Sequence, residues 1–205
     1  MSIKNRVGLF GGTFNPIHMG HLRVAEEAFR QCELSCVIFL PTGRPPHREV
    51  AEGVPGELRY QMVRLAIEGK PGMSVSRFEL DSRGPCYSVD TVITMKERYP
   101  QGVAYILGAD TFLGIETWKD WRRLLLSCPF IVAPRKGIPR QAFCREPFNL
   151  TEIYFLDMEE IDLSSSEIRR RYREGLPTEG LVPKPVDEFI RAQGLYGVAE
   201  ARSVG

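Results

Sequence analysis

Short apolar runs and helical repeats of apolar residues alternate along this chain. An apolar run bounded by glycine, proline or polar residues predicts a buried strand. Such runs lie at Val7–Phe10, Cys36–Leu40, Ala104–Leu107, Phe130–Ala133 and Ile153–Leu156, and Met73–Phe78 is a weaker strand candidate. Apolar residues one helical turn apart, with charged residues between them, predict amphipathic helices. One predicted helix begins at Met19. The others cover Leu58–Ile67, Ser88–Arg98, Trp118–Leu126, Ser165–Arg173 and Pro185–Ala192.

Strands that alternate with helices predict an α/β fold. Because right-handed crossovers place helices on both faces, we expect a Rossmann-like, doubly wound parallel sheet. The two last helices would form a short C-terminal helical segment at about 164–196. A length of 205 residues suits a single domain covering residues 1–205. Ligands of such a sheet bind beyond the carboxyl ends of its strands.

Composition limits the classes of partner. A net charge of +1 provides no overall electrostatic attraction to nucleic acid or to a membrane. The five cysteines are scattered and form no CxxC pair, which favours reduced thiols over a disulfide framework. No apolar run approaches roughly 18 residues, and no apolar signal core opens the chain, so we expect a cytoplasmic protein. The sequence leaves the oligomeric state open, a homo-oligomer included.

The segment Gly11–His21 carries the clearest chemistry. A strand ends in Gly11 and Gly12, whose lack of a side chain lets a ligand approach the backbone closely. A helix begins near Met19, and the N–H groups of its first turn have no partner within the helix. A strand, a glycine turn and a helix N-terminus together predict a phosphate site.

His18 and His21 flank this helix start, three residues apart. An HxxH pair can also ligate zinc, but zinc takes roughly three or four ligands and His47 is the only other histidine. The pair can equally be two capping or core histidines. The glycine turn and the helix start favour contact with phosphate.

The segment closely resembles the GxFxPxHxGH signature of the nucleotidyltransferase superfamily, and most of all its nicotinate mononucleotide adenylyltransferase branch. Asn15 stands where many relatives carry Asp. The resemblance covers the chain from Arg6 to about Tyr196.

A second motif lies at Leu163–Arg169. Ser164 and Glu167 have the spacing of a capping box, so the start of this helix is sharply specified. An ordinary capped helix with solvated arginines would also fit. The segment resembles the second phosphate-binding signature of the superfamily, ISSTxIR, which implies that Ser165, Ser166 and Arg169 hold phosphates.

Further segments resemble the same branch. Pro41–Arg48 is similar to its PPHK loop, Gly84–Thr91 to its SYTxDT segment, and Ile106–Asp110 to its strand-end GxD. The tryptophan that lies against the pyridine ring in that branch corresponds to Trp118, and Trp121 is expected in the core. These resemblances, with Arg135 at another strand end, imply a mononucleotide site formed by His47, Arg48, Tyr87, Ser88, Asp110, Trp118 and Arg135.

The resemblance implies transfer of the adenylyl group of ATP to nicotinate mononucleotide, giving deamido-NAD and pyrophosphate. His18, His21 and Arg169 would be catalytic, because the reaction needs positioning and positive charge rather than a general base. The ATP site would comprise Gly11, Gly12, Thr13, Phe14, His18, His21, Ser165, Ser166 and Arg169. Mg²⁺ is expected with ATP, without readable protein ligands, and Asp110 is expected at a ribose. Nicotinamide mononucleotide, pantetheine phosphate or another phosphorylated acceptor, and a non-catalytic nucleotide sensor, remain alternatives.

Overall fold

The computed structural model describes residues 2–43, 53–82 and 84–198. These residues form one parallel sheet of six strands in the order β3-β2-β1-β4-β5-β6. The strands are β1 (Val7–Gly12), β2 (Cys36–Pro41), β3 (Met73–Val75), β4 (Val103–Gly108), β5 (Phe130–Ala133) and β6 (Ile153–Phe155). The order reverses between β1 and β4. This confirms the predicted Rossmann-like, doubly wound sheet, and it places the topological switch point at the end of β1.

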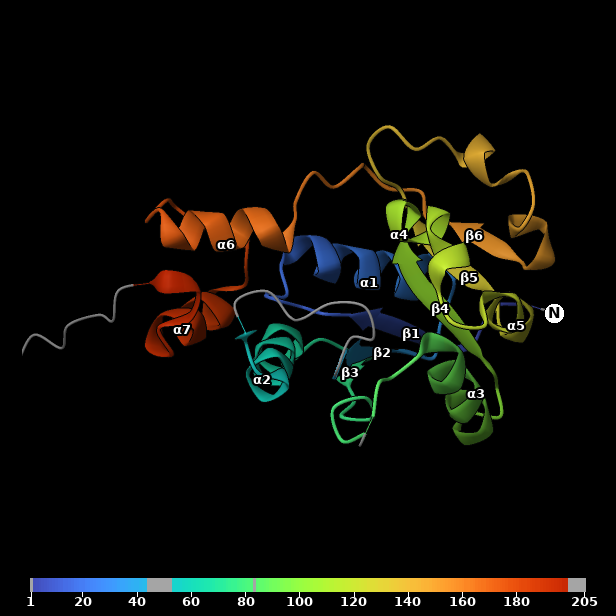
Figure 1. Cartoon of the computed structure of the whole chain (residues 1–205), viewed down its shortest axis with the longest axis horizontal. Helices are drawn as coiled ribbons and strands as arrows, with labels where there is room; N and C mark the ends of the chain where they lie inside the picture. Colours follow the sequence, from blue (N-terminus) through green and yellow to red (C-terminus); the bar gives the residue numbers. More distant parts are fainter. Residues whose placement is uncertain (1, 44–52, 83, 199–205) are drawn as a thin grey trace, which may run out of the picture.

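Helices connect the strands and complete the C-terminal part. They are α1 (Met19–Gln31), α2 (Gly56–Ile67), α3 (Ser88–Arg98), α4 (Ala109–Leu113), α5 (Trp121–Ser127), α6 (Ser165–Arg173) and α7 (Lys184–Ala192). Short 3-10 turns lie at Ile115–Thr117, Arg140–Phe143, Phe148–Leu150 and Leu195–Gly197. In Figure 1, α7 lies beside α2 at the left of the view with α6 above them, and α3 and α5 lie at the right. In the described part of the chain no helix combines the length and apolarity needed to span a membrane.

Two apolar cores cover the two faces of the sheet. Successive strand residues point to opposite faces, so Phe10 packs with the core under α1, α2, α6 and α7, and its neighbour Leu9 with the core under α3 and α5. Both faces are therefore apolar, which is why the strands are continuous apolar runs. Burial of each large side chain contributes roughly 1.5–3 kcal/mol.

Helix α1 follows the predicted pattern. Leu22, Ala25 and Ala28 recur at one-turn spacing and are buried against the sheet. The helix begins directly after His18, whose backbone is extended, and the Cys32 N–H closes its end on the Ala28 carbonyl. The sharp turn predicted at Gly11 and Gly12 is wrong: β1 continues through both glycines, and the chain turns at Asn15 and Pro16 before α1 begins.

Some predicted boundaries are wrong. The helix predicted over Trp118–Leu126 begins only at Trp121, because Asp120 adopts a left-handed backbone (φ 50°), and Trp118 lies in an extended link. The strand predicted over Met73–Phe78 ends at Val75. Helix α4 follows β4 directly and is absent from the sequence prediction.

Candidate functional site

A pocket of about 510 Å³ opens at the topological switch point, beyond the carboxyl ends of β1 and β4. This volume suits a nucleotide-sized ligand. The predicted residues that line it are Gly11, Gly12, Thr13, Phe14, His18, His21, Tyr87, Ser88, Asp110, Trp118, Arg135, Ser165, Ser166 and Arg169. His47 and Arg48 lie outside the described residues. The structure thus brings together predicted residues from six separate segments of the chain.

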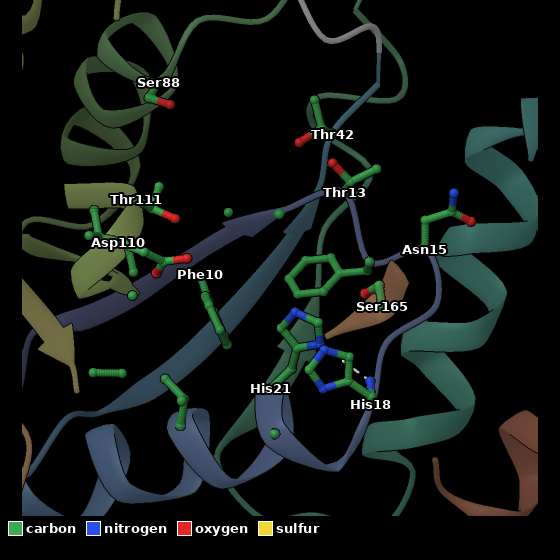
Figure 2. Close-up of a pocket in the computed structure, with 18 of the residues that line it drawn as sticks. Phe10, Thr13, Asn15, His18, His21, Thr42, Ser88, Asp110, Thr111 and Ser165 are labelled. Carbon is green, nitrogen blue, oxygen red and sulfur yellow. Dashed lines mark hydrogen bonds between the residues drawn. The ribbon is translucent and has the colours of Figure 1, made fainter. Parts of the chain in front are cut away.

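The two histidines form the floor of this pocket. Their rings stack with centroids 3.7 Å apart (Figure 2). The His18 backbone N–H donates to His21 Nδ1 at 3.3 Å. A ring nitrogen that accepts a hydrogen bond carries no proton, so neutral His21 holds its proton on Nε2. His21 is partly exposed and lines the pocket, and it therefore offers an N–H donor there.

Both imidazoles are held neutral. Burial, together with a smaller effect of the positive charge of Arg135, lowers the pKa of His18 to about 3. Burial likewise lowers the pKa of His21 well below its usual value, with smaller effects of His18 and Arg135. The His18 side chain is 3% exposed, and its Nδ1 has no hydrogen-bond partner among the described residues. Near neutral pH the pair therefore presents hydrogen-bonding groups rather than charge.

The N-terminus of α6 packs against the loop between β1 and α1. The Ser164 hydroxyl accepts from the Glu167 N–H at 3.2 Å, which confirms that half of the predicted capping box. The Glu167 carboxylate binds Arg170 and Arg171 of the same helix. The cap defines where α6 begins and so fixes the residues of its first turn.

Two residues of α6 reach across to the loop before α1. The Ser165 hydroxyl donates to the Pro16 carbonyl at 2.9 Å. Arg169 donates to the Asn15 carbonyl at 2.8 Å and to the Ser166 hydroxyl at 3.2 Å. In this structure, therefore, these groups join the two predicted phosphate motifs to each other.

Arg135, which follows β5, provides a second cation that lines the pocket. It donates to the Ile161 carbonyl at 2.9 Å and, over 3.4 Å, to the carboxylate of Asp110 at the start of α4. The Asp110 side chain remains 53% exposed and lines the pocket, so its carboxylate is accessible to a ligand hydroxyl.

The far end of the pocket is aromatic. Trp118 lies edge-to-face with Tyr105, with centroids 6.1 Å apart. Tyr87 and Ser88 stand at the start of α3, where first-turn N–H groups lack helical partners. Trp121 does not line the pocket and packs partly buried against the core, as predicted.

Sequence reasoning missed several lining residues. Lys119 stands with its ammonium 4.0 Å from the ring centre of Tyr87 and 3.5 Å from the Asp90 carboxylate. Its position next to Trp118 was a usable signal. Glu79 is 5% exposed and accepts from Thr91 at 3.0 Å, and burial raises its pKa to about 7. Nothing local marks Glu79 as a pocket residue.

The described pocket offers few metal ligands. No group of three or more His, Cys, Asp or Glu side chains suited to a metal ion occurs within residues 2–43, 53–82 and 84–198. Asp110 is the carboxylate that reaches the pocket while still exposed, and it is paired with Arg135. A divalent cation here would be held mostly by ligand and water oxygens, which is how Mg²⁺ commonly binds with phosphates.

The chain resembles known proteins along most of its length. A cytidylyltransferase-like family model matches residues 9–171. The chain is 41% identical to a probable nicotinate-nucleotide adenylyltransferase of Moorella thermoacetica, over 93% of this chain and 91% of that protein. It is 42% identical to the protein of the same name from Carboxydothermus hydrogenoformans, over 93% and 98%.

A solved structure shares the fold. Plasmodium falciparum nicotinic acid mononucleotide adenylyltransferase complexed with NaAD superposes with a TM-score of 0.80, covering 95% of this chain and 98% of that chain at 18% identity.

Proposed function

Since the chain belongs to the cytidylyltransferase-like family, we propose that its pocket transfers the adenylyl group of ATP to nicotinate mononucleotide. The products are deamido-NAD and pyrophosphate, so the chain is a nucleotidyltransferase of NAD biosynthesis. The observation that carries this proposal is the neutral histidine pair, stacked at the start of α1 in the same pocket as Arg169 and the start of α6.

The reaction is a displacement at phosphorus. A phosphate oxygen of the mononucleotide attacks the α-phosphorus of ATP, a new P–O bond forms, and the bond to the β-phosphate oxygen breaks. The attacking oxygen is already ionised near neutral pH, so no general base is required. Negative charge increases on the α-phosphate and on the departing pyrophosphate, and donors fixed in advance stabilise it.

The histidines suit the role of such donors. The hydrogen bond from the His18 N–H fixes the orientation of the His21 ring. The Nε2–H of His21 therefore already points into the pocket and does not have to reorient during the reaction. We assign this proton to an α-phosphate oxygen and His18 to the neighbouring phosphates. A neutral donor stabilises the developing charge without competing for a proton.

The cations hold the leaving group and the acceptor. Arg169, Ser165 and Ser166 bind the β- and γ-phosphates, exchanging bonds to the protein for bonds to the ligand. Gly11, Gly12, Thr13 and Phe14 contribute backbone contacts. Asp110 accepts from a ribose hydroxyl, and Arg135 lies beside it. A Mg²⁺ ion bound to ATP would be held mostly by phosphate and water oxygens and would offset phosphate charge.

The acceptor's pyridine ring lies against Trp118, near Tyr87 and Ser88. His47 and Arg48 are assigned to the same mononucleotide from their place in the sequence. We retain residues 1–205 as a single domain, with a cytoplasmic location.

One assay tests the proposed function. Pyrophosphate release is measured with ATP, Mg²⁺ and each of three acceptors: nicotinate mononucleotide, nicotinamide mononucleotide and pantetheine phosphate. We expect fastest turnover with nicotinate mononucleotide. Binding of ATP without turnover on any acceptor would identify a sensor instead, and faster turnover on another acceptor would replace the substrate.

A further inference from the structure

One arginine lies buried directly behind the pocket wall. Arg59, in the first turn and a half of α2, is 1% exposed. Its guanidinium donates to the carbonyls of Thr13 and Thr42, each at 2.7 Å. Longer bonds reach the carbonyls of Gly43 at 3.4 Å and Val54 at 3.3 Å. The side chain therefore ties α2 to the ends of both β1 and β2.

This buried cation is neutralised by no carboxylate in the part of the chain described here, since its bonds all go to backbone carbonyls. Burial lowers the pKa of Arg59, but a guanidinium starts so high that it stays charged near neutral pH. Burying a charge without a counter-ion is expensive unless something nearby compensates for it. A bound phosphate would supply the opposite charge.

The bonded carbonyls belong to peptide groups of the pocket wall. Thr13 and Thr42 both line the pocket, and Figure 2 shows them side by side at its upper edge. The Thr42 N–H donates to the Gly12 carbonyl at 2.9 Å, so the two strand ends move as one unit. The N–H and C=O of a trans peptide point in opposite directions. With the Thr13 and Thr42 carbonyls on Arg59, the following N–H groups of Phe14 and Gly43 point away from it.

We propose that Arg59 is a positioning residue for phosphate binding. It aims the Phe14 and Gly43 N–H groups at a phosphate of a substrate, and its charge polarises both peptides toward that anion. The inference rests on the proposed function for the identity of the substrates, ATP and nicotinate mononucleotide, either of which can supply the phosphate.

If Arg59 only held α2 against the strands, its loss would affect ligand binding in a different way. Loss of a purely structural contact loosens the whole pocket wall, so it weakens the binding of phosphorylated and dephosphorylated ligands alike. A residue that orients and polarises phosphate donors affects the phosphorylated ligand selectively. The ratio of the two affinities therefore separates the two roles.

The experiment measures binding by calorimetry to wild type, Arg59→Met, Arg59→Lys and the control Arg64→Met. Arg64 lies on the same helix but is exposed and bonded to Gln61. The ligands are ATP against adenosine, and nicotinate mononucleotide against its riboside. We expect Arg59→Met to weaken at least one phosphorylated ligand about tenfold more than its dephosphorylated counterpart, because bonds to charged groups are the stronger ones. The pair that responds identifies which substrate's phosphate is bound.

Arg59→Lys keeps the charge but loses the planar fork that reaches both carbonyls. We expect an intermediate, phosphate-selective loss of about threefold, and no selective change in Arg64→Met. Equal weakening within each ligand pair, or none, overturns the proposal. If Arg59→Met does not fold, Arg59→Lys decides, and wild-type binding of all four ligands by that variant overturns it. A wild-type protein that releases no pyrophosphate defeats the proposed function, but the ATP–adenosine comparison still tests Arg59.

Discussion

His21 offers the sharpest test of the mechanism, because its two ring nitrogens have separate tasks. Nδ1 accepts the His18 N–H, and Nε2–H is left for the pocket. His21→Ala removes both. Loss of one preorganised donor to a developing oxyanion lowers kcat by about 10²–10³, equivalent to roughly 2.7–4 kcal/mol. ATP affinity should change much less, because the donor acts mainly in the transition state.

His21→Ala also removes packing. Its ring stacks on His18 and lies edge-to-face with Phe14, whose centroid is 5.1 Å away. Each such ring pair is worth about 0.5–1.5 kcal/mol. The lost acceptor for the His18 N–H adds about 1 kcal/mol. We therefore expect the free energy of unfolding to fall by about 2–4 kcal/mol, which must be measured separately from kcat.

Two further variants separate the tasks of the ring. His21→Asn places an acceptor near the position of Nδ1 but no donor as far out as Nε2, so stability should be kept better than in His21→Ala while kcat stays low. His21→Gln carries an amide N–H₂ at about the reach of Nε2, so it should restore part of kcat. Arg23→Ala on the same helix, which removes an exposed ion pair with Glu159, is the matched control.

The assays are pyrophosphate release for kcat, calorimetry for ATP binding, and urea unfolding for stability. Near-normal kcat in folded His21→Ala refutes the assigned role. A loss of ATP affinity as large as the loss of kcat/KM refutes it as well, because His21 would then be an ordinary ground-state contact.

Three further predictions follow from the same geometry. Arg169→Ala should lower kcat by about 10²-fold or more, because the leaving group loses a cation. Arg171 is bonded to Glu167 and the Pro177 carbonyl, so Arg171→Ala should change kcat less than about threefold. Similar small effects of both variants on pyrophosphate release would make the start of α6 an ordinary capped helix. We expect kcat/KM to be at least about tenfold higher for the acid mononucleotide than for the amide, because charged hydrogen bonds are about 1 kcal/mol stronger than neutral ones. Lys119→Met should reduce this ratio. Equal use of the amide would contradict the substrate assignment. Because the pKa of His18 is about 3 in the folded chain, the unfolded chain binds a proton between about pH 6.5 and 3 that the folded chain does not. The free energy of unfolding should therefore fall by up to about 4–5 kcal/mol as the pH drops from about 6.5 toward 3. Urea unfolding of His18→Leu should show a flatter pH dependence, and an unchanged slope would contradict a buried neutral imidazole.

The strands could be predicted because both faces of the sheet are covered. A strand between two apolar layers, such as Phe130–Ala133, is apolar at every position and stands out without an alignment. The link before α5 could not be predicted in the same way. Trp118 and Trp121 have helical spacing, but the left-handed backbone of Asp120 separates them, and no residue type in that stretch requires that conformation.

The candidate site divides along the same line. The Gly11–His21 segment and the start of α6 are local in sequence, so their residue types and spacing were sufficient to predict that they line one pocket. Arg59 and Glu79 were not identifiable, because each matters through contacts with segments distant in sequence. The carbonyls that bind Arg59 include those of Thr13, 46 positions away, and Thr42, 17 positions away. A helical arginine next to Leu58 is indistinguishable from a solvated one until α2 is placed against the sheet.

The site separates charge from hydrogen bonding. Burial is the main reason that the pKa of both histidines is low, and the charge of nearby Arg135 adds to this effect. Protonated imidazoles beside Arg135 would add repulsion to the free enzyme, and imidazoles with an ordinary pKa would titrate across the working pH. Neutral rings avoid both effects while leaving Nε2–H of His21 as a donor. In the proposed mechanism, fixed arginine charge binds two anionic substrates, and a donor whose protonation stays constant stabilises the charge that develops between them.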